Sequence, residues 1–184
     1  MNVYETSSIR NVVFLGHGGS GKTTLAEAIS YSTGVITRMG RVQDGNTISD
    51  YDKEEIKRKF SINASVIPVE WNGLKINILD APGYFDFVGQ MEDAMSVADA
   101  RIFFITNMDD PNAKYMEIVE QLKERFGKKV APFHLPIIED GKLTGYVNVV
   151  KMGGRKFTDD LGSYTERDIP EDLTPELEPC REQL

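Results

Sequence analysis

The chain has 184 residues, 40% of them hydrophobic, and a net charge of −8. Its length suits one globular core with a small appended unit. It contains no run of about 18 apolar residues, so no membrane span is expected, and its single cysteine, Cys180, excludes an internal disulfide and fits a reducing, cytoplasmic environment.

The first part of the chain alternates between apolar runs and helical periodicity. A buried strand is predicted at 11–16 and a helix at 22–34, which ends at a glycine. The polar segment 35–59 is too long for a tight connection, so we expect it to be a functional or mobile loop. Two apolar runs, 61–71 and 74–80, flank an Asn-Gly dipeptide, which is a strong hairpin signal.

The next part continues this pattern and then changes it. A helix is predicted at 85–100, a strand at 101–106 and a helix at 111–127. The order so far predicts an α/β fold, a sandwich with a mostly parallel central sheet. From residue 129 onward, a second hairpin-like unit surrounds residues 139–142.

The end of the chain carries most of the negative charge. From Phe157 onward there are nine acidic and two basic residues, which leaves a balance of −1 for the first 156 residues. Such a tail is typical of solvated surface, and at most one short helix is expected in it.

A phosphate-binding motif lies between the first strand and the first helix. The stretch "GHGGSGKT" matches G-x-x-x-x-G-K-[ST] in the strand-to-helix context that this motif requires. Its backbone N–H groups and the positive end of the helix favour phosphate oxygens, with the lysine on the β- and γ-phosphates and the threonine on Mg²⁺. The predicted nucleotide-binding residues here are Gly16, His17, Gly18, Gly19, Ser20, Gly21, Lys22, Thr23 and Thr24.

The stretch "ILDAPG" supplies a second half to this site. Asp80 ends a strand, where a carboxylate can hold Mg²⁺, and Gly83 can offer its N–H to a γ-phosphate without a side chain in the way. Downstream of a phosphate loop, this motif is strong support for a nucleotide site.

These motifs together resemble a known family. The stretches "GHGGSGKTTL", "SINASV" and "DAPGYFDFVGQMEDAMSVADA" resemble the GTP-binding domain of translation elongation factor G and of its elongation-factor-G-like relatives. The similarity continues through "RIFFITNMDD" and into "HLPIIEDGKLTGYVNVVKM", which resembles the start of an insert in that GTPase domain.

The resemblance implies a P-loop NTPase fold of three layers and a division of the chain. Residues 1–128 are expected to form the GTP-binding domain, and residues 129–184 the beginning of the inserted subdomain with its acidic tail. GTP or GDP and Mg²⁺ are the implied ligands, the ribosome is the implied partner of the full-length protein, and a monomer is expected.

Two positions depart from the switch segments of the family. The first switch of the family ends R-G-I-T-I, and "RKFSI" here places Ser61 where the Mg²⁺-binding threonine stands; alternatively, Ser61 only begins a strand.

The second switch normally has histidine after its glycine, and here it has Tyr84. A phenol is a poor proton acceptor at neutral pH. With Lys22, Gly83 and Tyr84 as the predicted catalytic residues, we expect slow hydrolysis or dependence on a partner. Alternatively, Tyr84 simply packs against the ribosome or a neighbouring helix.

The base-recognition motif of the family, N-K-x-D, is altered as well. Without gaps, "FITNMDD" places Thr106 and Asn107 at the first two positions and Asp109 at the aspartate. A shift of one residue places Asn107, Met108 and Asp110 instead. The first register keeps the strand in phase, and under either register the lysine is missing, so we expect guanine preference with modest affinity.

A strand and a helix of the family are missing between Ala100 and Arg101. In the family that strand lies beside the first strand, so its loss predicts a gap in the core and suggests that the sequence omits a segment. Without the family, "RIFFIT" could fill the place itself, but the base motif would then be misplaced. The later guanine-binding loop and further domains are also not present, so an N-terminal fragment is expected.

Four functions remain open from the sequence. The preferred one is the GTPase domain of an elongation-factor-G-like protein acting in translocation on the ribosome. The alternatives are a weakly hydrolysing ribosome-associated or tetracycline-resistance-type ribosome-protection module, a small ATP-dependent phosphotransferase, and an inert fragment.

Overall fold

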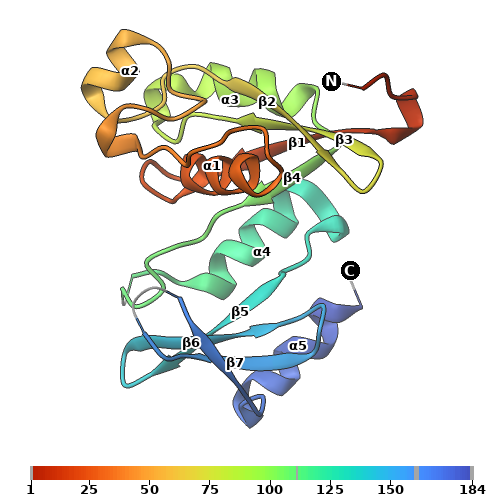
Figure 1. Cartoon of the computed structure of the whole chain (residues 1–184). Coiled ribbons are helices and arrows are strands. Elements are labelled where there is room, and N and C mark those ends of the chain that lie inside the picture. Colours follow the sequence, from red (N-terminus) through yellow and green to blue (C-terminus); the bar gives the residue numbers. More distant parts are fainter. Residues whose placement is uncertain (1, 111, 160–161, 183–184) are drawn as a thin grey trace. The chain divides into compact units, whose positions relative to one another are not determined.

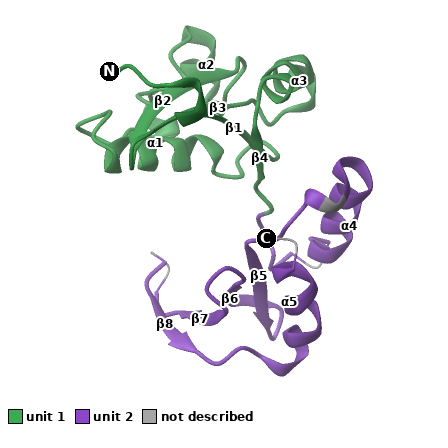
Figure 2. Cartoon of the chain, turned by 90° about the vertical axis from the view of Figure 1, so that its right-hand side faces the viewer, with its two compact units in different colours: residues 1–105 green, residues 106–184 purple. Residues whose placement is uncertain are grey.

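The chain folds into two compact units. The computed structural model describes residues 2–110, 112–159 and 162–182. The first unit is Met1–Ile105 and the second is Thr106–Leu184 (Figure 2). The domain boundary predicted after residue 128 remains a prediction, although the helix that precedes it groups with the second unit.

The first unit is a four-stranded sheet with helices (Figure 1). The strand order is β2-β3-β1-β4, in which β1 is parallel to both β3 and β4, and β2 is antiparallel to β3. The elements are β1 (Ile9–Leu15), α1 (Lys22–Ser32), α2 (Lys53–Arg58), β2 (Ser65–Trp71), β3 (Leu74–Asp80), α3 (Val88–Ser96) and β4 (Ala100–Phe103).

Alternation along the strands divides this unit into three layers. Val13 and Leu15 of β1 pack with Ala94 of α3 on one face of the sheet. On the opposite face, Phe14 of β1 packs with Ala26 of α1. Successive side chains of a strand point to opposite faces, so one strand serves both cores. The predicted α/β sandwich with a mostly parallel sheet is confirmed.

The strand register brings the two predicted motifs together. Phe14 of β1 pairs with Asp80 of β3. Because the two strands are parallel, the loops that leave their carboxyl ends start at the same edge of the sheet. The phosphate loop and the "DAPG" segment therefore lie at one place in the fold.

Strand β4 lies beside β1, at the position that the strand missing from this sequence has in the family. Ala100 pairs with Val12, and Phe103 pairs with Leu15. The segment "RIFFIT" thus fills this place itself, which was the alternative considered above. The expected gap in the core is filled, because β4 covers that side of β1.

The second unit is a four-stranded antiparallel sheet of order β5-β6-β7-β8 with the helices α4 and α5. One face of the sheet buries Leu135 and Val147 against Leu177 and Cys180 of α5. The prediction of a solvated tail is therefore wrong in part, because the final helix of the tail completes a core. Leu177 and Cys180 of this helix are each only 2% exposed. The elements are α4 (Tyr115–Phe126), β5 (His134–Glu139), β6 (Lys142–Asn148), β7 (Gly153–Phe157), β8 (Tyr164–Arg167) and α5 (Thr174–Arg181).

Candidate functional site

The phosphate loop connects β1 to α1. Its last residue before the helix, Gly21, has φ of 90° and forms the left-handed N-cap of α1. This conformation favours glycine, which explains the glycine immediately before the lysine. The loop therefore ends at the amino end of an eleven-residue helix, whose dipole favours an anion there.

Lys22 reaches back across this loop. Its Nζ donates hydrogen bonds to the carbonyl oxygens of Gly16 and His17, both at 2.9 Å. Burial lowers the pKa of Lys22, and the charge of Asp80 acts in the opposite direction. The ammonium group is thus held over the loop by backbone carbonyls, with a carboxylate near enough to support its charge.

A chain of oxygen atoms runs from β3 through α1 to the segment before β2. Thr23 donates from Oγ1 to Oδ2 of Asp80 at 2.7 Å. The hydroxyl oxygens of Thr23 and Ser61 lie 3.3 Å apart, and Ser61 donates to Oδ1 of Asp50 at 2.7 Å. Because β2 begins only at Ser65, the reading of Ser61 as the first residue of a strand is wrong.

These oxygens fit a magnesium ion. Among the described residues, Asp80 Oδ1, Asp50 Oδ2 and Ser49 Oγ are buried without a hydrogen-bond partner. Buried polar atoms normally have partners, so oxygens left over beside two hydroxyl groups are compatible with a hard cation. Mg²⁺ commonly takes one or two protein ligands and completes its shell with water and phosphate oxygens. The predicted ligands Thr23, Ser61 and Asp80 are brought together.

Asp50 of this cluster was missed by sequence reasoning, as was its neighbour Ser49. It lies in the long polar segment, where "ISDYDKEE" contains several acidic residues and nothing in the pattern separates one from another. Asp50 is 4% exposed, and burial raises its pKa, while the hydrogen bond from Ser61 opposes that shift. Only the folded position of the segment identifies it.

Asp80 should make the stability of the metal-free protein depend on pH. Burial raises the pKa of Asp80 to about 6, partly offset by the hydrogen bond from Thr23. The folded state therefore holds this proton more tightly than the unfolded state, so the resulting stability is present at about pH 4 and is lost as the pH rises through about 6. Between the two ends of this pH range, the contribution of Asp80 to the free energy of unfolding changes by about 3 kcal/mol. We expect Asp80→Asn to be more stable than the wild type in EDTA at pH 7, and equally stable at pH 4.

Urea unfolding of the two proteins across this pH range measures the difference. Asparagine can still accept the hydrogen bond from Thr23, so the comparison isolates the charge. A difference that is constant with pH would contradict the assignment of this pH dependence to Asp80.

The "DAPG" segment lies directly against the phosphate loop. A Cβ at Gly83 would come within 2.6 Å of the backbone nitrogen of Gly18 and 2.5 Å of the carbonyl carbon of His17. Any side chain at residue 83 would therefore separate the two segments. The close approach explains why glycine follows the proline here.

Tyr84 lies over the same loop. A Cβ at Gly18 would come within 2.6 Å of the phenol ring of Tyr84, and the ring centroid of Phe60 is 4.7 Å from that of Tyr84. Tyr84 is 45% exposed. Its ring is thus packed on one side and open on the other, which is compatible with both roles considered for it, and its catalytic role remains a prediction.

The predicted base-reading residues lie in an exposed turn after β4. Asn107 has φ of 56°, and its carbonyl accepts from the backbone N–H of Asp110 at 3.0 Å. Asn107 and Asp109 are both exposed and belong to the second unit. Their role in guanine recognition remains a prediction.

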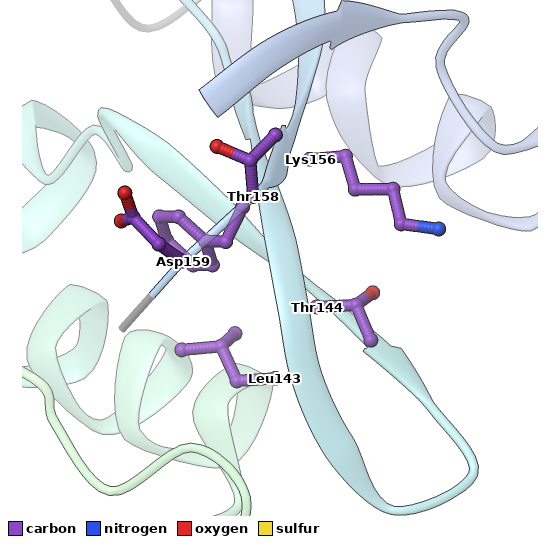
Figure 3. Close-up of a pocket in the computed structure, with 6 residues that line it drawn as sticks. Leu143, Thr144, Lys156, Thr158 and Asp159 are labelled. Atoms are coloured by element: carbon purple, nitrogen blue, oxygen red, sulfur yellow. The ribbon is translucent and has the colours of Figure 1, made fainter. Parts of the chain in front are cut away.

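The second unit has a hollow of its own, shown in Figure 3. Its polar side chains include one lysine and one aspartate, and Asp159 accepts from the backbone N–H of Ser163 at 2.9 Å. Its described lining includes neither a glycine loop nor an oxygen cluster like that of the first unit, so it does not compete as a nucleotide site. The lining residues are Leu143, Thr144, Lys156, Phe157, Thr158 and Asp159.

Comparisons with known proteins agree with this geometry. Residues 7–133 match the family described as the elongation factor Tu GTP binding domain. A crystal structure of a protein from Thermus thermophilus is 30% identical in sequence, with a TM-score of 0.71, and the match covers 96% of this chain and 30% of that one.

This chain spans 30% of the length of the Thermus thermophilus protein. Within the described residues, no helix combines the length and the apolar character needed to cross a bilayer. The match over residues 7–133 includes the phosphate loop, Ser61 and the "DAPG" segment. The chain belongs to the elongation factor Tu GTP-binding domain family, and the resemblance to elongation-factor-G-like translational GTPases is confirmed.

Proposed function

We propose that this chain binds GTP and GDP with Mg²⁺ and hydrolyses GTP slowly, as the GTP-binding domain of an elongation-factor-G-like translation factor. Through the full-length protein, a cytoplasmic monomer, hydrolysis is coupled to translocation on the ribosome. The observation that carries this proposal is the cluster of Thr23, Asp80 and Ser61 oxygens at the end of the phosphate loop.

The residues divide the chemistry between them. Lys22 exchanges its two carbonyl partners for β- and γ-phosphate oxygens, and the N–H of Gly83 approaches the γ-phosphate. Thr23 and Ser61 offer hydroxyl oxygens to Mg²⁺, and Asp80 supports the ion with its carboxylate. Mg²⁺, when bound, neutralises charge that develops on the phosphate oxygens. Asn107 and Asp109 are assigned to the base.

A second candidate is supported by the packing of Tyr84. Its ring rests on Gly18 and Phe60, so the residue after Gly83 has a structural role that does not require catalysis. In this reading, the chain is a weakly or non-hydrolysing module that binds nucleotide and associates with the ribosome, or protects it in the manner of a tetracycline-resistance protein.

Two measurements test the proposal. Titration with fluorescent GDP and ATP in Mg²⁺ should show tighter binding of GDP, and a preference for ATP would contradict both candidates. Multiple-turnover GTP hydrolysis by the full-length protein, with and without ribosomes, then separates them. Stimulation by ribosomes supports the GTPase, whereas tight binding without turnover supports the second candidate.

A further inference from the structure

The segment between α1 and β2 is held in place by buried carboxylates. Glu27 lies on α1 and is 1% exposed, and Glu55 lies on α2 and is 2% exposed. A charged side chain in such a position is costly unless its oxygens are satisfied. Both side chains accept hydrogen bonds from backbone N–H groups of this segment, so each fixes the main chain rather than another side chain.

Glu27 closes a loop onto α1. Its Oε2 accepts from the backbone N–H of Gly40 at 2.7 Å, and its Oε1 accepts from the backbone N–H of Ile48. A Cβ at Gly40 would come within 2.3 Å of the carbonyl oxygen of Asn46. The backbone at both ends of segment 40–48 is therefore hydrogen-bonded to one carboxylate. At the first end, Gly40, there is no room for a side chain.

This contact is linked to the candidate magnesium site in two steps. Ile48 is two residues before Asp50, and Asp50 accepts from Ser61. Glu27 is four residues after Thr23, so both side chains lie on the same face of α1. The helix therefore holds the segment at two points one turn apart, through the Glu27 carboxylate and through the hydroxyl contact between Thr23 and Ser61.

We propose that Glu27 is a positioning residue: it holds segment 40–50 on α1 and so keeps Asp50 and Ser61 beside Thr23 and Asp80. This inference rests on the proposed function for its consequence, which is that Glu27 sets the Mg²⁺ concentration needed for triphosphate binding. This role requires a carboxylate, because both of its oxygens accept a backbone hydrogen bond. A glutamine has one acceptor oxygen and would turn an amide donor toward the second N–H.

The other end of the segment has its own anchor. Glu55 accepts from the N–H groups of Ile62 and Asn63, both at 2.9 Å, and from that of Asp52 at 3.1 Å. The residues that follow Ser61 are therefore held independently of Glu27. Their amide protons give an internal reference for the experiment.

The test is hydrogen exchange of the full chain combined with a Mg²⁺ titration. In Glu27→Gln, amide exchange in 40–50 should be faster by about tenfold or more, while Ile62 and Asn63 remain protected. The Mg²⁺ midpoint for a fluorescent, non-hydrolysable GTP analogue should rise by about tenfold, because the loss of one charge-assisted hydrogen bond destabilises the placed segment. GDP affinity in EDTA should stay the same, since the phosphate loop is untouched.

Matched variants keep the test decisive. Glu54→Gln is the same substitution on a side chain of α2 that is 51% exposed, and it should behave as the wild type in both measurements. If Glu27→Gln fails to fold, Glu27→Asp keeps the charge but is one methylene shorter, and it should release the amide of Gly40 or of Ile48.

Three outcomes decide the matter. Wild-type exchange of 40–50 in the Glu27 variants would overturn the proposal. An equal loss of GDP affinity in EDTA would also overturn it, because Glu27 would then support the whole unit rather than the segment. If the wild type bound no nucleotide, the proposed function would fail, and the exchange data would still decide whether Glu27 holds the segment.

Discussion

Lys22→Ala should weaken GDP binding by about tenfold or more, because a hydrogen bond to a charged group contributes about 1.5–3 kcal/mol, and GDP offers this lysine only the β-phosphate of the two phosphates assigned to it. In the structure, the Lys22 side chain is already positioned to replace its carbonyl partners with phosphate oxygens. Its ammonium group is already held over the loop by the carbonyls of Gly16 and His17, and it is 6% exposed. Little conformational entropy remains to be lost when phosphate replaces those carbonyls.

Fluorescent GDP titration in Mg²⁺ measures the effect, and Lys57→Ala is the control. Lys57 is an exposed lysine on α2, so its removal changes the net charge equally without touching the loop. The control should bind GDP as the wild type does. An equal loss in both variants would indicate long-range charge rather than contact, and an unchanged affinity in Lys22→Ala would contradict the placement of phosphate in this loop.

The elements of the first unit could be predicted because their signals are local. The apolar run before the glycines is β1, the helical periodicity after them is α1, and Asn72-Gly73 joins β2 to β3. The phosphate loop, with Lys22 and Thr23, depends on a fixed spacing along the chain. Such a spacing is readable without knowledge of the fold.

The parts that escaped prediction depend on contacts between distant residues. Asp50 becomes part of the site only because the segment folds back to bring it to Ser61, and Glu27 appeared to be an ordinary residue of a periodic helix. A local signal does mark one element of this segment. Asp52 and Glu55 form a capping box, a D-x-x-E pattern that marks the start of α2 within the predicted loop.

The acidic tail shows the limits of composition as a guide. Its charge predicted a solvated excursion, yet β8 and α5 belong to the second unit, and Leu177 and Cys180 are buried. An acidic helix can be charged on one side and apolar on the other, and the net charge of a segment does not report this. Burial follows from the pattern, which in the eight residues of α5 is only about two turns long.

The residue at position 84 is expected to limit the rate of GTP hydrolysis. Tyr84→His should raise ribosome-dependent turnover by about tenfold to a hundredfold, because an imidazole can position and polarise water at neutral pH and a phenol accepts protons poorly there. The imidazole is also smaller than the phenol ring, so it can be accommodated against Gly18 without displacing the loop. GDP affinity should stay the same, since the substitution leaves Lys22 and Thr23 in place.

Tyr84→Phe separates the hydroxyl group of Tyr84 from its ring. Phenylalanine keeps the packing on Phe60 and on Gly18, but it removes the oxygen. If the phenol handles the attacking water, Tyr84→Phe should hydrolyse GTP more slowly than the wild type, while Tyr84→His is faster. If all three proteins turn over at one rate, the side chain of residue 84 does not limit hydrolysis, and its role is the packing of the second switch against the phosphate loop.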